Sequence, residues 1–212
     1  MAENLINNLT VDFFFISVLS YLVGSIPFGL IFTRIAGLGD IRSIGSGNLG
    51  ATNVLRTGNK TLALLTLLSD AGKGGAIIIF TQHFYSDDNS FIPFIILSGI
   101  LLVLGHNFPV WLRFKGGKGI ATTLGILIAA NWIVGIAACL TWLIIALLFR
   151  YSSLAALIAI ITSPIYAWHL NDTNLVILTG IFVILAFFQH RENIIRLVKG
   201  NENKINLGKN RN

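Results

Sequence analysis

The sequence predicts an all-α protein: a polytopic bundle of transmembrane helices that forms a single integral membrane domain over residues 1–212. Of its 212 residues, 54% are hydrophobic and only 11% are charged, whereas a soluble domain carries about a quarter charged residues. The apolar residues come in runs of bilayer length and do not alternate with polar ones. A helix rises about 1.5 Å per residue, so about 20 apolar residues cross a hydrocarbon core of about 30 Å.

Six apolar runs account for the predicted spans, in the order 11–32, 61–81, 91–104, 120–149, 153–168 and 175–188. The first run is too long for the apolar core of a signal peptide, and no small-residue cleavage site follows it. We therefore expect a retained span. The fourth run is too long for one comfortable crossing and short for two.

Alternate polar connections carry almost all of the basic residues. Fourteen of the fifteen Lys and Arg side chains lie in one set of connections, and Lys73 alone lies within a span. That set holds Arg34, Arg42, Arg56, Lys60, Arg113, Lys115, Lys118, Arg150, Arg191, Arg196, Lys199, Lys204, Lys209 and Arg211. The other set holds Glu3, Asp12, Asp87, Asp88 and Asp172. The positive-inside rule puts the basic set in the cytoplasm, the N-terminus outside, and a basic tail over about residues 191–212 inside.

This assignment requires the fourth run, residues 120–149, to cross twice. The expected turn is Asn131–Trp132, between two helices of about 15 residues, or about 22 Å, each. Helices this short need local thinning of the bilayer or a start inside the preceding loop. The prediction is then seven spans, with the N-terminus outside and the C-terminus cytoplasmic.

Composition also limits cofactors and partners. The single cysteine, Cys139, excludes an intramolecular disulfide and argues against a cysteine metal site. The net charge of +6 suits anionic membrane lipid at the cytoplasmic surface better than nucleic acid. We predict no metal, no cofactor and no nucleic-acid partner.

The first polar segment of interest, the glycine–asparagine segment, is residues 45–53, followed by Arg56. Its sequence is Gly-Ser-Gly-Asn-Leu-Gly-Ala-Thr-Asn. The glycines let the backbone approach a ligand. Neutral hydrogen bonds are offered by Ser46, Asn48, Thr52 and Asn53, and Arg56 offers a charged fork suited to phosphate. A plain polar turn between two membrane helices explains the same residues.

The second, the lysine–glycine segment, is residues 105–119 and runs into a predicted helix at Ile120. Its end, Lys115-Gly116-Gly117-Lys118-Gly119, has the composition of an anion site, in which backbone N–H groups, a helix N-terminus and two ammonium groups converge. The spacing is not that of a Walker A loop. The alternative is a basic anchor at the membrane surface, and His106 alone is more typical of a structural histidine.

The third, the C-terminal segment, is residues 190–202. Read as a continuing helix, it places His190, Asn193 and Leu197 on one face with Arg196 close by. A basic amphipathic tail on anionic lipid explains the lysines and arginines here, but it explains His190 and Asn193 less well.

Two further features lie at or within the spans. Asp70 and Lys73 have i, i+3 spacing inside the second apolar run, so they can pair on one helix face. Such an ion pair indicates a functional site or a lock between helices. Residues 150–153 are expected to cap the following span, and the hydroxyl of Ser153 can alternatively meet a ligand.

Taken together, these segments resemble a known family. Residues 46–53, residues 105–122 and residues 190–202 are similar, in order, to the three signature segments of the bacterial acyl-phosphate:glycerol-3-phosphate acyltransferases, and residues 24–29 also look like the family. The resemblance spans nearly the whole chain. It implies a seven-helix bundle with the N-terminus outside, in agreement with the charge argument.

The resemblance also implies an enzyme and its partners. Acyl phosphate and sn-glycerol 3-phosphate would give 1-acylglycerol 3-phosphate (lysophosphatidate) and inorganic phosphate, the first acylation in phosphatidic acid and phospholipid synthesis. The enzyme would lie in the bacterial cytoplasmic (inner) membrane with its active site facing the cytoplasm. It would receive acyl phosphate by hand-off from the enzyme that forms it.

The expected roles follow from this chemistry, because both substrates carry phosphate. Phosphate would be cradled by Lys115, Gly116, Gly117 and Lys118. Ser46 and Asn48 would hydrogen-bond the acyl phosphate, and Arg56, His190 and Asn193 would orient glycerol 3-phosphate. The expected substrate-binding set also includes Gly47, Asn53, His106 and Ser153. The expected catalytic residues are His190, Lys118 and Ser46.

The base is left open. His190 or His106 can serve, or a phosphate oxygen of a bound substrate can take the hydroxyl proton, and the resemblance favours the last route. A transporter for an anionic metabolite is the competing class, since glycine-rich breaks and an intramembrane Asp–Lys pair fit it. Against a transporter, the basic segments fall on one face and no inverted repeat is visible.

Overall fold

The computed structural model describes residues 2–85 and 91–205, and in these ranges it contains ten α-helices, three short 3₁₀ helices and no strand. The α-helices are α1 (Ala2–Gly24), α2 (Phe28–Ile35), α3 (Ala51–Val54), α4 (Lys60–Tyr85), α5 (Phe91–Asn107), α6 (Ile120–Ala130), α7 (Trp132–Phe149), α8 (Ser152–His169), α9 (Thr173–Gln189) and α10 (Arg191–Val198). The predicted all-helical class is confirmed for these ranges.

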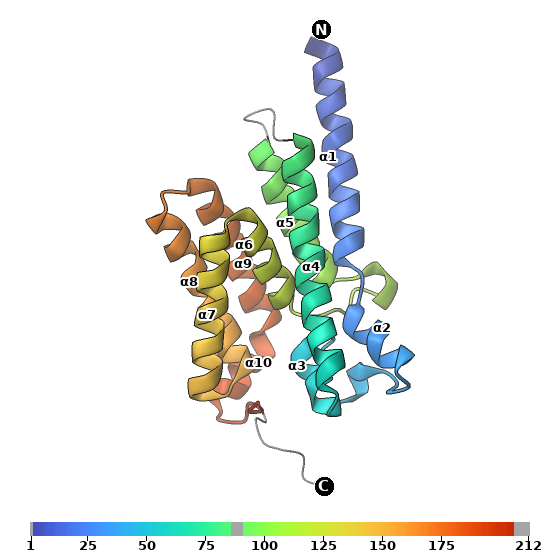
Figure 1. The fold of residues 1–212 in the computed structure, drawn as a ribbon, viewed down its shortest axis with the longest axis vertical. Helices are drawn as coiled ribbons and strands as arrows, with labels where there is room; N and C mark the ends of the chain where they lie inside the picture. The colour runs from blue at the N-terminus through green and yellow to red at the C-terminus, as the bar shows by residue number, and fades with distance from the viewer. Residues whose placement is uncertain (1, 86–90, 206–212) are drawn as a thin grey trace.

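Long apolar helices make up most of the bundle (Figure 1). Within the described residues, five helices are long and apolar enough to cross a membrane, and a bent pair, α9 with α10, raises the number to six. Helix α6 is apolar but has only 11 residues, which is about 16 Å of helix.

The predicted break near Asn131 is confirmed, but the predicted lengths of its two helices are wrong. Helix α6 has 11 residues and α7 has 18, rather than about 15 each. Asn131 ends one helix and caps the next, because its side-chain oxygen accepts hydrogen bonds from the N–H groups of Ile133 and Val134 at 3.1 and 3.3 Å. In Figure 1 the chain turns back on itself here, so that α6 and α7 run side by side.

The first predicted span is borne out as one candidate membrane span, Thr10–Ile35. It is not one continuous helix, because α1 ends at Gly24 and α2 begins at Phe28. The break contains Pro27, whose nitrogen carries no hydrogen to continue the helix ladder. Gly24 lies directly against α5, because a Cβ there would stand 2.3 Å from the carbonyl oxygen of Leu102. The early motif 24–29 is therefore a helix break at a tight helix crossing.

The C-terminal segment also differs from prediction. The last span does not continue as a straight helix through His190, since α9 and α10 meet there at a 65° bend. His190 is the C-cap of α9 and the N-cap of α10. The bend turns α10 across the end of the bundle.

Small residues allow the central helices to approach each other closely. A Cβ on Gly125 of α6 would lie 2.0 Å from the carbonyl oxygen of Ala71 on α4, and one on Gly74 would lie 2.4 Å from that of Thr122. Contacts of this kind hold membrane helices together, because lipid offers no hydrophobic drive for their association. Helix α4 is thereby fixed against α6 along the middle of the molecule.

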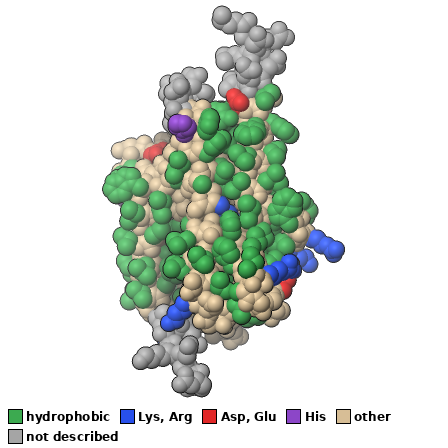
Figure 2. Space-filling model, turned by 45° about the vertical axis from the view of Figure 1, so that its right-hand side comes forward, with side chains coloured by type: hydrophobic (Ala, Val, Ile, Leu, Met, Phe, Trp, Pro, Cys, Tyr) green, Lys and Arg blue, Asp and Glu red, His purple; other side chains and the backbone are tan. Residues whose placement is uncertain are grey.

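The face seen in Figure 2 is largely apolar, and most of its Lys and Arg side chains gather toward the end opposite the N-terminus. Helices α2, α3 and α10 lie at the end opposite the N-terminus (Figure 1). The glycine–asparagine segment leads into α3 and the C-terminal segment contains α10, so both lie at that end, and Lys118 of the lysine–glycine segment contacts Asn193 on α10. Of the residues used in the charge argument, Asp87, Asp88, Lys209 and Arg211 lie outside the described residues, as does the side chain of Glu3.

Candidate functional site

The lysine–glycine segment folds back onto the end of α5. The Gly116 N–H donates to the Asn107 carbonyl at 3.1 Å, and the Gly117 N–H donates to the His106 carbonyl at 3.0 Å. Both N–H groups therefore donate to carbonyls within the protein. In this conformation they are not free to bind phosphate, as the expected cradle requires. Gly119 then adopts a positive φ of 76° as the N-cap of α6, which favours glycine.

Lys118 points from this loop toward the C-terminal segment. Its ammonium donates to Oδ1 of Asn193 on α10, so residues 75 positions apart in the chain meet. Burial lowers the pKa of Lys118 to about 8, against an ordinary value of 10.5. Glu202 opposes that shift, while the positive charges of Arg196 and Arg56 add to it. The charge of Arg56, which follows the glycine–asparagine segment, and charged side chains of the C-terminal segment therefore both influence the pKa of Lys118.

Glu202 organises the C-terminal side of this region. Its Oε1 accepts hydrogen bonds from Ser153 at 2.8 Å and Asn193 at 2.6 Å, and its Oε2 accepts one from Arg196 at 2.7 Å. Burial alone would raise the pKa of Glu202, but hydrogen bonds from these three side chains outweigh it and hold that pKa below its ordinary value. Lys118, Asn193, Glu202, Ser153 and Arg196 form one cluster, here called the loop–tail cluster.

Ser153 therefore has a protein partner rather than a free hydroxyl. The expected serine cap of α8 is wrong, because Tyr151 occupies the N-cap position and makes no side-chain capping bond. Ser152 instead lies 3.1 Å from Thr52, hydroxyl oxygen to hydroxyl oxygen. This contact joins the glycine–asparagine segment to the start of α8.

Within the glycine–asparagine segment, Asn53 holds the loop in shape. Its side chain is 2% exposed; Nδ2 donates to the carbonyls of Ile41, Ile44 and Asn48 at 2.8–3.0 Å. Its Oδ1 accepts from the backbone N–H of Ser46 at 3.0 Å. The amide is fully occupied, so the expected substrate contact from Asn53 does not fit the structure, whereas Ser46 and Gly47 remain exposed.

The remaining expected binding residues differ in exposure. Arg56 and Lys115 are exposed, and Asn48 is half-buried. His190 is buried, and its Nδ1 donates to the carbonyl of Ala186 at 2.8 Å. In the neutral imidazole this bond leaves Nε2 as the acceptor nitrogen. His190 therefore has the tautomer that a proton acceptor at Nε2 requires.

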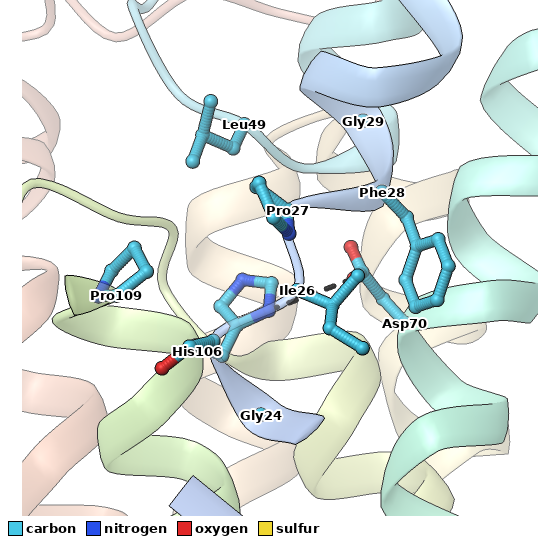
Figure 3. Close-up of a pocket in the computed structure, with 10 residues that line it drawn as sticks. Gly24, Ile26, Pro27, Phe28, Gly29, Leu49, Asp70, His106 and Pro109 are labelled. Atoms are coloured by element: carbon cyan, nitrogen blue, oxygen red, sulfur yellow. Dashed lines mark ion pairs between the residues drawn. The ribbon is translucent and has the colours of Figure 1, made fainter. Parts of the chain in front are cut away.

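His106 lies apart from the other expected site residues. It is 7% exposed, and Nδ1 lies 3.0 Å from the Lys73 ammonium and 3.3 Å from the Thr122 hydroxyl. The predicted Asp70–Lys73 pair is confirmed, with 3.0 Å between Oδ1 and Nζ. Figure 3 shows His106 and Asp70 facing each other from α5 and α4. Asp70, Lys73 and His106 form the second cluster, here called the intramembrane cluster.

Sequence reasoning missed two features of the site. Glu202 was recognised only as part of a motif, although it binds three side chains. The contact between Thr52 and Ser152 was not expected, since nothing in the local pattern links positions 100 residues apart. The available signal for Glu202 was that it is one of only two carboxylate side chains, with Glu192, in the basic tail.

Comparison with known proteins identifies relatives along almost the whole chain. The family model described as glycerol-3-phosphate acyltransferase matches residues 14–200. A glycerol-3-phosphate acyltransferase of Rhodospirillum rubrum is 53% identical over 192 residues, which is 89% of each chain. One from Caulobacter vibrioides is 53% identical over 186 residues, 87% of this chain and 84% of the relative.

Solved structures agree with these sequence matches. The crystal structure of PlsY (YgiH), an integral membrane glycerol 3-phosphate acyltransferase in its glycerol 3-phosphate form, superposes with a TM-score of 0.85. It is 35% identical and covers 92% of this chain and 96% of its own. The lysophosphatidic acid form gives a TM-score of 0.83 at 34% identity, covering 91% and 95%.

Proposed function

The chain belongs to the glycerol-3-phosphate acyltransferase family, and on that premise we propose that its acyl donor is an acyl phosphate. The product would be 1-acylglycerol 3-phosphate, released with inorganic phosphate. The single observation that carries this proposal is the contact between Lys118 and Asn193, flanked by Arg196 and Arg56. A site with several cations suits two phosphorylated substrates held side by side.

We propose that the protein lies in the bacterial inner membrane with this site toward the cytoplasm. The basic residues at the end opposite the N-terminus support that sidedness. Helix α6 would supply a seventh crossing with α1, α4, α5, α7, α8 and α9. Since α6 spans only about 16 Å, the loop before it would sit below the membrane surface, where a lipid-borne donor can reach it.

The proposed roles combine partly or fully exposed residues with two buried side chains, His190 and Asn193. Lys118 would contact phosphate together with the free N–H groups of the first turn of α6, which have no partner inside a helix. Ser46, Gly47 and Asn48 would hold the acyl phosphate, with Lys115 nearby. Arg56, His190 and Asn193 would orient glycerol 3-phosphate.

In the proposed reaction the 1-hydroxyl oxygen of glycerol 3-phosphate attacks the carbonyl carbon of the acyl phosphate. The new C–O ester bond forms, and the bond from that carbon to the phosphate oxygen breaks. Inorganic phosphate leaves, and a phosphate oxygen takes the hydroxyl proton. Acyl phosphate is already activated, so positioning and charge neutralisation can supply most of the rate.

The proton route can be tested with the two buried histidines. We expect single replacements, His190→Gln and His106→Gln, to lower kcat by less than about 1,000-fold, because the substrate's own phosphate takes the proton. A larger loss of kcat in either variant, with binding of glycerol 3-phosphate intact, would identify that histidine as the base.

The donor is tested by measuring inorganic phosphate released by the purified protein from palmitoyl phosphate, with and without glycerol 3-phosphate. We expect release only when both are present, together with a lipid product of one acyl chain. Palmitoyl-CoA, offered as the competing donor, should give no product. Transfer from the thioester at an equal rate would refute acyl phosphate as the donor, and phosphate release independent of glycerol 3-phosphate would refute the transferase reaction.

A further inference from the structure

The intramembrane cluster is closed to substrates. The cavity between Asp70 and His106 has a volume of about 10 Å³, enough for about one water molecule. Figure 3 shows Ile26, Pro27 and Leu49 over the two side chains. No phosphorylated substrate fits there, so any effect of this cluster on the reaction must act through other residues.

Lys73 joins three parts of the fold. Its ammonium lies 3.0 Å from Oδ1 of Asp70, donates to the carbonyl of Ile26 at 2.8 Å and lies 3.0 Å from Nδ1 of His106. An ammonium has three donors and no acceptor. The Lys73 ammonium donates to the Ile26 carbonyl, lies within hydrogen-bond distance of Nδ1 of His106, and forms an ion pair with Asp70, whose Oδ1 accepts no hydrogen bond among the described residues. Lys73 thereby ties α4 to the break between α1 and α2 and to the end of α5.

His106 carries this connection to the lysine–glycine segment. Its carbonyl holds the Gly117 N–H at 3.0 Å. A Cβ on Gly117 would lie 2.1 Å from Nε2 of His106, so the imidazole edge rests against the Gly117 backbone. Lys118, the residue that reaches Asn193, follows directly.

We infer that Asp70, Lys73 and His106 are positioning residues that fix the height and orientation of the loop bearing Lys118, and so set the affinity for the phosphate of glycerol 3-phosphate. This inference rests on the proposed function. The alternative is a lock that only holds helices together. A lock would change stability, whereas a positioning cluster changes ligand affinity at equal stability.

The test replaces both charges at once, with Asp70→Leu combined with Lys73→Met. Removing one partner strands a buried charge, but removing both in favour of apolar side chains of similar size often leaves stability unchanged. Binding of glycerol 3-phosphate to the purified protein, without donor, is measured by calorimetry beside the thermal midpoint. We expect Kd to rise at least tenfold while Tm stays within a few degrees.

A matched control lies at the same helix interface. Thr81 of α4 and Ser98 of α5 are fully buried, and their hydroxyl oxygens lie 3.3 Å apart. Thr81 is 11 residues from Asp70, about 16 Å along the helix, and it has no contact with the loop among the bonds described. Thr81→Val should change Tm by no more than a few degrees and leave Kd within twofold of wild type.

A second variant keeps the inference testable if the double replacement fails to fold. His106→Asn places an amide oxygen near the position of Nδ1, facing Lys73, but leaves the space beneath Gly117 unfilled. We expect the same rise in Kd. An unchanged Kd in a folded variant of either kind would overturn the positioning role, as would an equal rise in the Thr81→Val control. Failure of the wild-type protein to bind glycerol 3-phosphate would instead overturn the proposed function.

Discussion

The loop–tail cluster and the intramembrane cluster contain similar side chains in different surroundings. In the loop–tail cluster, Lys118 is half-buried and shares its neighbourhood with several charges of both signs. In the intramembrane cluster, Asp70 and Lys73 are 3% exposed at their side chains and neutralise each other. The cations of the first cluster, Lys118 and Arg196, remain partly exposed, whereas the charges of the second are buried against each other.

The difference suggests how a membrane enzyme separates binding from support. A charged side chain that binds substrate must remain accessible to it. Partial burial of that side chain disfavours its charged form. A charge that supports a loop is best paired completely, because an unpaired ion in a low-dielectric interior is expensive. The predictions below test this division, from the largest expected effect to the smallest.

The largest effect is expected at Lys118. Lys118→Ala should lower kcat/KM by about 1,000-fold, or about 4 kcal/mol of transition-state stabilisation, because a cation beside both phosphates is lost. The value of kcat/KM is measured from phosphate release at saturating acyl phosphate, with the concentration of glycerol 3-phosphate varied. Lys60→Ala, which removes an exposed cation at the start of α4, should stay within twofold. Equal losses in the two variants would mean that Lys118 acts only through net charge.

The next effect is expected at Glu202. Glu202→Ala removes the common acceptor of Ser153, Asn193 and Arg196, so it should lower kcat/KM by about 30- to 100-fold and reduce Tm. Glu202→Gln keeps one acceptor oxygen and should lose less. A folded Glu202→Ala variant with wild-type activity would show that Asn193 needs no support from the tail.

An intermediate effect is expected from pH. The pKa of Lys118 is about 8, so its ammonium loses its proton as pH rises through 8, while the phosphate of glycerol 3-phosphate is already ionised. KM for glycerol 3-phosphate should rise by about 16-fold from pH 8 to pH 9.5, in proportion to the loss of the protonated form. Lys118→Arg should abolish this rise of KM with pH, because guanidinium keeps its charge. A rise of KM that persists in Lys118→Arg would show that another group titrates.

The smallest effect is expected at a surface ion pair. Asp40 contacts Arg42 at 2.6 Å and Arg34 at 3.4 Å, and its pKa is lowered mainly by the hydrogen bond from Arg42. The Asp40 side chain is 32% exposed, so Asp40→Asn should cost less than about 1 kcal/mol of unfolding free energy. Activity should not change. A tenfold loss of activity would place this loop in the site.

Much of the fold was predictable from charge and apolar length. The break at Asn131 followed from the need to put Arg150 and the basic tail on one side, and the structure has that break. The interruption at residues 25–27 was missed, because an apolar run does not show how strongly Pro27 acts within it. The 65° bend at His190 was missed for a different reason, because no proline or glycine in the sequence marks it.

The site was less predictable than the fold. Spacing was sufficient for the Asp70–Lys73 pair, which depends only on helix geometry. It was not sufficient for Asn53, whose amide binds three carbonyls that come together only when the loop has folded. The same limit applies to Gly116 and Gly117, whose N–H groups bind the end of α5 rather than remaining free. Residue type predicts which groups can bind phosphate, and tertiary contacts decide which of them are still free to do so.

The central claim is that the lysine–glycine and C-terminal segments form one anion site through Lys118 and Asn193. A double-mutant cycle of Lys118→Ala and Asn193→Ala on kcat/KM for glycerol 3-phosphate tests it most directly. The account predicts that the double variant loses little more than the worse single variant, a coupling of at least about 1.5 kcal/mol. Losses that add to within about 0.5 kcal/mol would mean that the two residues act at separate sites, and would contradict the account.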